Sequence, residues 1–139
     1  MAFAGISYMG VLLAAIASWI FGAAYYGVLG GRWAEALGKS RAELMPGGRP
    51  PVVPMLISFI AELAMAWVLA GVIGHLGPGN VTVRAGLISG ALCWVGFVLT
   101  TLATNNAYAQ TRRSLTLIDG SHWLGVLLIQ GLVIGIIGV

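Results

Sequence analysis

The chain has 139 residues, enough for one domain, and its composition excludes a soluble globular protein. Hydrophobic residues make up 59% and charged residues 8% of the chain, whereas an average soluble domain carries about 25% charged residues. The formal net charge of +3 does not indicate nucleic-acid binding, because the basic residues lie in loops beside apolar segments.

Four segments are apolar enough and long enough to cross a bilayer, which takes roughly 20 helical residues. Helices satisfy their own backbone hydrogen bonds in lipid. We therefore predict an all-α, multi-pass membrane protein in which four transmembrane helices form one antiparallel bundle. The expected spans cover residues 3–26, 52–75, 83–105 and 116–139.

The first span is expected to stay in the protein rather than be cleaved as a signal peptide, because no Lys or Arg precedes it. A long loop over residues 27–51 follows and is predicted to be cytoplasmic. In this loop Gly38 is expected to end a short turn. Ser40 and Glu43 have the spacing of a capping box, which predicts a second short helix that ends at Pro46.

The basic residues predict the orientation of the chain. The first and third loops hold six of them, namely Arg32, Lys39, Arg41, Arg49, Arg112 and Arg113. The second loop holds only Arg84. Because the first and third loops of a four-span protein lie on the same side, the positive-inside rule places them in the cytoplasm and both termini outside it.

The second span contains a single carboxylate, Glu62, about halfway along it. On insertion scales a charge at this depth costs roughly 2.5–3.5 kcal/mol, so Glu62 is expected to face protein or water. In the first span Ser18, Gly22 and Tyr25 share one helical face. We predict a polar intramembrane cluster on the cytoplasmic side, made of Ser18, Glu62, Thr100, Thr101, Asn105, Asp119, His122 and Gln130.

Each member of this cluster also has a purely structural interpretation. Ser and Thr hydroxyls in membrane helices commonly bond back to their own helix. Asp119 has the position of a helix cap, and His122 can donate to it from three residues further on. For Glu62, a neutral carboxyl group that bonds to a Ser or Thr carries as much weight as a functional acid.

Three glycine pairs have the G-x-x-x-G spacing that lets membrane helices approach closely: Gly27/Gly31, Gly86/Gly90 and Gly131/Gly135. With 21 glycines in the chain, some such pairs arise by chance. Gly86 and Gly90 lie well inside the third span, and we predict that they form a helix-packing seam.

Motifs of soluble enzyme chemistry are missing from the sequence. It has no glycine-rich phosphate loop, no C-x-x-C, no H-E-x-x-H and no nucleophile elbow. Cys93 is the single cysteine, so an internal disulfide is impossible. We expect no enzymatic activity, no metal site and no cofactor. Axial ligation of a haem or chlorin by His75 or His122 remains an open alternative.

Four stretches carry a resemblance to a known family: "FGAAYYGVLGGRW" (21–33), "MAWVLAGVIGHLG" (65–77), "WVGFVLTTLATNNAYAQ" (94–110) and "LTLIDGSHWLGVLLIQGLVIG" (115–135). The whole chain resembles the bacterial integral membrane family catalogued as domain of unknown function 1761. The most specific parts are W-x-G-F-x-x-T-T and L-x-L-I-D-x-x-H-W. The resemblance implies four spans in the bacterial inner membrane and brings no activity.

Three function classes follow from these observations. The first is a homo-oligomeric channel or transporter in which the polar residues around Glu62 form a path for a solute or a proton. The second is an accessory or structural subunit of a larger membrane complex. A membrane enzyme ranks lowest, because the sequence shows no nucleophile–base pair. The partners expected are lipid and other membrane proteins rather than nucleic acid.

Overall fold

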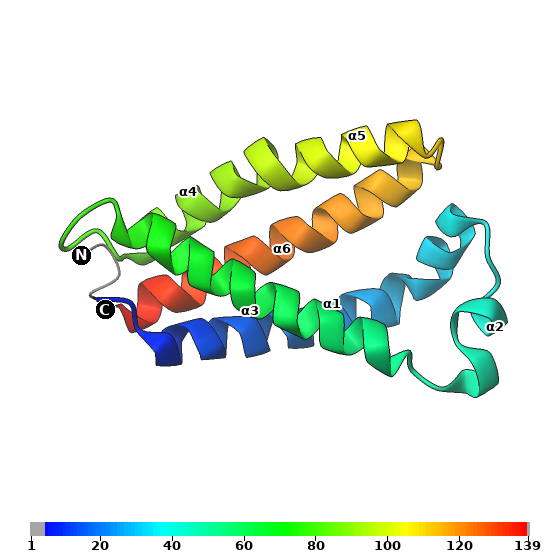
Figure 1. Ribbon diagram of the computed structural model, residues 1–139, viewed down its shortest axis with the longest axis horizontal. Coiled ribbons are helices and arrows are strands. Elements are labelled where there is room, and N and C mark those ends of the chain that lie inside the picture. Colours follow the sequence, from blue (N-terminus) through cyan, green and yellow to red (C-terminus); the bar gives the residue numbers. More distant parts are fainter. Residues whose placement is uncertain (1–4, 139) are drawn as a thin grey trace.

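A computed structural model describes residues 5–138 and shows a bundle of helices joined by short connections (Figure 1). The elements in chain order are α1 (Tyr8–Leu37), α2 (Arg41–Leu44), the 3₁₀ turn η1 (Pro46–Gly48), α3 (Val52–Gly74), α4 (Val83–Cys93), the π-helical turn η2 (Trp94–Leu99), α5 (Thr100–Tyr108) and α6 (Arg113–Ile137). Four stretches are long and apolar enough to cross a membrane: α1, α3, α4 through α5, and α6. The predicted all-α membrane protein with four spans is confirmed. The outer ends of the first and last predicted spans, residues 3–4 and 139, lie outside the described residues.

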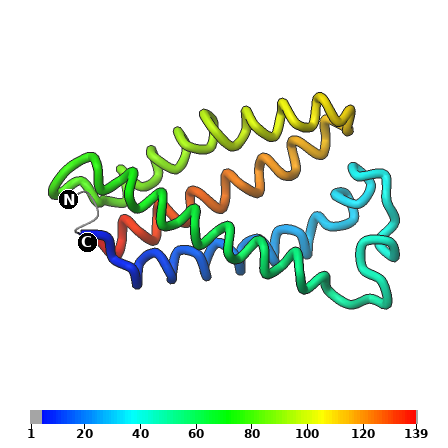
Figure 2. Tube along the Cα trace, in the orientation of Figure 1, coloured from blue at the N-terminus to red at the C-terminus, as the bar shows by residue number. Residues whose placement is uncertain are grey.

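The helix α6 is the centre of the arrangement, because it contacts α1, α3, α4 and α5. It runs between the α4–α5 helix on one side and α1 with α3 on the other (Figures 1 and 2). The start of α1, the end of α6 and the α3–α4 connection lie at one end of the molecule. The α1–α3 connection and the α5–α6 turn lie at the opposite end, which we call the basic end because six of the seven Lys and Arg residues are there.

The first helix is longer than the sequence predicted. It does not stop at Tyr26 but continues to Leu37, because glycine is tolerated inside membrane helices and residues 32–37 include strong helix formers. The helix ends where Gly38 takes a φ of +69°, a left-handed conformation that glycine adopts without strain. The predicted loop over 27–51 is therefore wrong in its first part, which is helical.

The rest of that loop contains the predicted capping box. The Ser40 backbone N–H donates to Glu43 Oε2 at 2.6 Å, and the Glu43 N–H donates to Ser40 Oγ at 3.2 Å. The bond from the Ser40 N–H holds the pKa of the Glu43 carboxyl below its usual value. The short helix α2 follows this cap, and the chain then turns through Pro46–Gly48 into α3.

The third span is not a uniform α-helix. Residues Trp94–Leu99 form a π-helical turn between α4 and α5. Such a turn inserts an extra residue and so rotates the side chains that follow it by about 100° relative to an unbroken α-helix. The Trp94 indole N–H donates to the Gly120 carbonyl at 2.8 Å, which ties this turn to α6.

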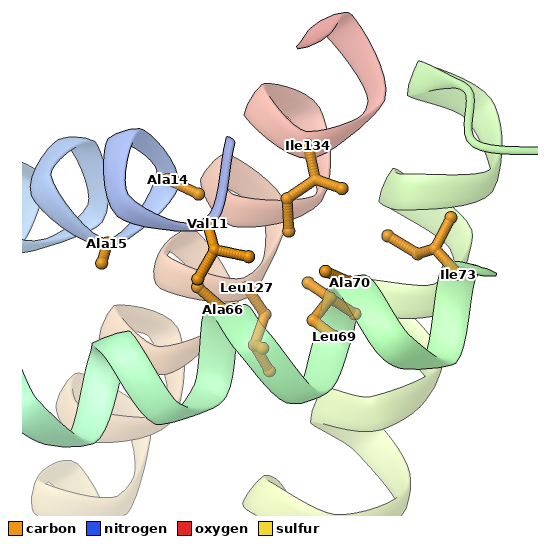
Figure 3. Close-up of a cluster of buried hydrophobic side chains, with 9 residues drawn as sticks. All are labelled: Val11, Ala14, Ala15, Ala66, Leu69, Ala70, Ile73, Leu127 and Ile134. Carbon is orange, nitrogen blue, oxygen red and sulfur yellow. The ribbon is translucent and has the colours of Figure 1, made fainter. Parts of the chain in front are cut away.

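The apolar core lies in the half of the molecule that contains the chain ends. Small and branched side chains from α1, α3 and α6 meet there (Figure 3): Val11, Ala14, Ala15, Ala66, Leu69, Ala70, Ile73, Leu127 and Ile134. Alanine is frequent in this cluster, so the helix axes can approach closely, as is typical of membrane bundles.

Glycines bring the backbones of α4 and α6 into contact. A Cβ atom at Gly86 would lie 2.0 Å from the Gly131 carbonyl oxygen, and one at Gly90 would lie 2.7 Å from the Leu127 carbonyl oxygen. A Cβ at Gly135 would lie 2.5 Å from backbone atoms of Thr82. Gly86 and Gly90 thus belong to a packing seam inside this chain, and they share it with Gly131 and Gly135. By contrast, a Cβ at Gly27 or Gly31 would meet nothing within 4 Å.

Candidate functional site

The buried polar group at the centre of the bundle joins three helices. The Ser18 hydroxyl on α1 donates to Glu62 Oε2 on α3 at 2.6 Å. The Gln130 side-chain amide on α6 donates to Ser18 Oγ at 3.0 Å and to the Glu62 backbone carbonyl at 2.9 Å. Ser18 and Gln130 are 0% exposed and Glu62 is 1% exposed. We call these three residues the polar triad.

The triad gives Glu62 the protein environment that its depth requires. A carboxyl group against lipid at mid-span would be costly, and here one of its oxygens accepts a short hydrogen bond from another helix. Gln130 holds this geometry from α6. Its Oε1 atom is buried and has no hydrogen-bond partner among the described residues. The acid therefore sits in an enclosed site built by three helices of a single chain.

His122 shares the space above Gly22 with the second oxygen of Glu62. A Cβ atom at Gly22 would lie 2.8 Å from His122 Nε2 and 3.9 Å from Glu62 Oε1. Gly22 is the residue on α1 that leaves room for both groups, since any larger side chain would occupy the position between them. Two titratable side chains from α3 and α6 therefore face each other over the backbone of α1.

Aromatic rings surround the His122 imidazole. The Phe21 ring stacks on it with an interplanar angle of 6° and a centroid distance of 6.1 Å. The centroids of Tyr26 and Trp123 each lie 4.8 Å from that of His122, and the centroid of Tyr25 lies 5.5 Å from it. The imidazole is only 5% exposed. These rings, which we call the aromatic layer, cover the His122 imidazole.

Asp119 lies one turn of α6 closer to the basic end, on the other side of the aromatic layer from Glu62. Its Oδ1 accepts a hydrogen bond of 2.6 Å from the Tyr26 hydroxyl, and the side chain of Trp33 approaches the same carboxyl group. The Tyr25 hydroxyl donates to the Ile118 carbonyl at 2.8 Å. Asp119 is thus bonded to α1, and its interpretation as a helix cap is wrong, because α6 begins at Arg113 and Asp119 lies inside it.

The structure does not bring Thr100, Thr101 and Asn105 into the cluster, and their prediction as members is wrong. All three are on the exposed face of α5. The Thr100 and Thr101 hydroxyls donate to the Gly96 and Phe97 carbonyls of their own helix, at 2.9 and 2.5 Å. The π-helical turn before them explains the error, because it rotates α5 relative to the regular helix that the sequence implied.

The cluster thus consists of two groups, the polar triad and the pair Asp119–Tyr26, with His122 between them. Sequence reasoning missed Tyr26 and Trp33, because Tyr26 is the last residue of the predicted first span and Trp33 lies in the predicted loop, where it fits the aromatic belt of a membrane interface. The spacing of four residues from Gly22 to Tyr26 places both on one face of a helix. This spacing was the sequence signal that could have identified Tyr26 as part of the site.

A metal centre has no support in the described part of the chain, where no three His, Cys, Asp or Glu side chains gather closely enough to hold an ion. His75 is the C-cap of α3, and its Nδ1 is 2.7 Å from the Gly71 carbonyl of that helix. Because a carbonyl can only accept, this nitrogen carries a hydrogen. His75 and His122 lie on different helices and in different environments.

The fold and the buried site together define a multi-pass helical membrane protein with an enclosed acid. The chain belongs to the family described as "Protein of unknown function (DUF1761)", whose model matches residues 9–135. This confirms the resemblance inferred from the sequence. No curated protein and no solved structure matches the chain.

Proposed function

We propose that this protein is a small proton-coupled channel or transporter and that Glu62 is the group that binds the proton. The observation that carries the proposal is the burial of Glu62 at mid-span in a site that α1, α3 and α6 build together. Intramembrane acids are costly and are a regular feature of proton relays and transporters. Transport, rather than enzymatic catalysis, is the proposed activity.

The proposed orientation in a bacterial inner membrane has both termini outside the cytoplasm and the basic end inside, with the helices antiparallel. The distribution of basic residues supports this orientation, because six of them lie at the basic end and one, Arg84, lies at the opposite end. In this orientation Glu62 lies near the middle of the bilayer and the Asp119–Tyr26 pair lies closer to the cytoplasm. The polar residues then extend from mid-membrane toward one side only.

A homo-oligomer is the proposed assembly. An exposed polar face on α5 consists of Thr100, Thr101 and Asn105. The third span is also the least buried of the four spans, because only 17% of its apolar 18-residue stretch is buried inside the molecule. A second copy of the chain would cover this face. An accessory subunit of a larger complex would use the same face to dock on another protein, and the mass of the purified assembly distinguishes the two.

The test is proton flux into liposomes that contain the purified protein, driven by a potassium diffusion potential and followed with an enclosed pH-sensitive dye. Glu62→Gln keeps the shape and hydrogen bonding of the side chain but cannot carry a proton, so flux should fall to that of empty liposomes. Glu35→Gln is the matched control, because Glu35 is exposed on α1, and it should conduct like the wild type. Equal flux through wild type and Glu62→Gln, or no flux through wild type, would overturn the proposal.

A further inference from the structure

His122 is the buried titratable group whose surroundings are least explained by packing alone. Its Nδ1 atom is enclosed and has no hydrogen-bond partner among the described residues. Buried polar atoms normally have partners, and each exception calls for an explanation. The ring is also held on every side, by the aromatic layer and by the backbone at Gly22.

The other histidine shows what a structural imidazole in this chain does. His75 bonds through Nδ1 to the carbonyl four residues earlier, Gly71, at 2.7 Å. For His122 the equivalent carbonyl belongs to Ile118, and it accepts the Tyr25 hydroxyl at 2.8 Å. Tyr25 therefore takes the bond that would otherwise fix the protonation of Nδ1, and within residues 5–138 no group forms a hydrogen bond with this nitrogen.

The His122 ring lies between groups that lead to two different acids. Nε2 lies at Gly22, opposite Glu62 Oε1. Toward the basic end the ring contacts Tyr26, with a centroid distance of 4.8 Å, and the Tyr26 hydroxyl bonds to Asp119 at 2.6 Å. The titratable groups around His122 are thus Glu62 from α3, Tyr25 and Tyr26 from α1, and Asp119 from its own helix.

We propose that His122 relays protons between Glu62 and the Asp119–Tyr26 pair, in a path that crosses the aromatic layer over Gly22. This inference rests on the proposed function, and it identifies His122 as the group that accepts the proton from Glu62. Its structural basis is the placement of one imidazole between two carboxyl groups, with one nitrogen toward Glu62 and the other unbonded to protein. An imidazole suits this role because it can accept at one nitrogen and release from the other.

Each step conserves atoms and charge. The O–H bond of neutral Glu62 breaks, an N–H bond forms at His122 Nε2 through an intervening water molecule, and a carboxylate and an imidazolium result. The imidazolium then releases its Nδ1 proton through water to the Asp119 carboxylate. The imidazole is left with its hydrogen on Nε2, and tautomerisation, in which Nε2 releases a proton to water and Nδ1 takes one up, restores the starting form.

The liposome assay separates this relay from the wider proposal. His122→Gln should reduce proton flux by on the order of a hundredfold, the scale of a lost acid–base group, whereas the matched variant His75→Gln should leave it unchanged. Gly22→Ala is a second variant, because its methyl group would stand between Glu62 and His122, and flux should fall there also. Gly27→Ala, on an open part of the same helix, is its control.

A spectroscopic measurement adds a readout that a structural role would not move. With only two histidines in the chain, ¹⁵N-histidine labelling in bilayers gives two sets of ring-nitrogen signals, one for each imidazole. The His75→Gln variant shows which set belongs to His75. Glu62→Gln should shift the His122 signals and their pH midpoint and leave those of His75 in place.

The outcomes are distinct. Full flux through His122→Gln and Gly22→Ala, together with loss through Glu62→Gln, would overturn the relay and leave the proposed function intact. His122 signals that ignore Glu62→Gln would also overturn it. Absence of flux through wild type would overturn both proposals.

Discussion

Between Leu127 and Gly135, α6 meets α4 through the backbone, whereas between Asp119 and Trp123 it meets α1 through large side chains. In the first region a single added Cβ would overlap a carbonyl, at 2.0 Å for Gly86. In the second region four aromatic rings and an imidazole fill the space between the helices. The same helix thus uses two opposite kinds of contact.

The glycine region holds α6 rigidly in place, whereas the side-chain region contains the titratable groups. Backbone atoms in contact cannot move apart without breaking the seam, so the glycine region fixes the position of α6. Side chains can change rotamers and protonation while the helix axes stay in place. The titratable residues Asp119 and His122 lie in the second kind of contact, and Glu62 lies between the two regions.

The largest expected effect concerns which side of the membrane each region occupies. A reporter that fluoresces only in the cytoplasm should stay dark when it is fused to the C-terminus, beyond the glycine region. The same reporter inserted at Gly47, beside the basic end, should be bright, because the basic residues keep that end inside. A bright C-terminal fusion would reverse the orientation of both regions.

Next is the glycine region itself. Gly86→Ala should lower the free energy of unfolding by about 3 kcal/mol, the upper range for an overpacked core, because the new methyl group would overlap the Gly131 carbonyl. The measurement is reversible unfolding in mixed micelles with a denaturing detergent. Gly27→Ala should cost nothing, since no atom lies within 4 Å of its Cβ position. Equal losses in the two variants would show that backbone contact does not fix α6.

A smaller effect is expected between the two regions, in the polar triad. Ser18→Ala removes the donor to Glu62 Oε2 and one acceptor of Gln130. The expected loss is about 1–2 kcal/mol, near the upper end for a hydrogen bond inside a membrane protein. Ser114→Ala, at an exposed position at the start of α6, is the control. If both serines cost the same, the triad contributes nothing to stability.

The smallest effect belongs to the aromatic region. Tyr26→Phe keeps the ring beside His122 and removes only the bond to Asp119, so we expect a loss of about 0.5–1 kcal/mol. Tyr108→Phe, with its ring 88% exposed, should be neutral in the same unfolding assay. A loss as large as that of Gly86→Ala would show that this region is as rigid as the glycine seam.

The fold was largely predictable because the lipid bilayer restricts a spanning chain to helices of a defined length. Apolar segments of the necessary length must form helices in lipid, and all four were found. The end of the first span was misplaced because Gly27 and Gly31 resemble a break, whereas the helix ends only at Gly38, where the φ angle is positive. The π-helical turn at Trp94–Leu99 has no signal in hydrophobic periodicity.

The site was partly predictable for the same reason. Glu62 required a partner at its depth, and the sequence offered Ser18 and Gln130 on other spans. Whether Thr100 and Thr101 could join them depended on the rotation of α5. The one residue inserted by the π-helical turn rotates α5 by about 100° and so turns these threonines away from the cluster. The role of Gly22 follows only from the distances to His122 and Glu62, which no single span reveals.

The length of α1 has a consequence for how proteases act on this protein. A helix of 30 residues is roughly 45 Å long, while the hydrocarbon core of a bilayer is about 30 Å thick. Its last turns therefore extend beyond the hydrocarbon core as ordered helix, and a protease must unfold them locally before it can cut. Trypsin should spare Arg32 and cleave first at Lys39, which is exposed and follows Gly38 with its positive φ.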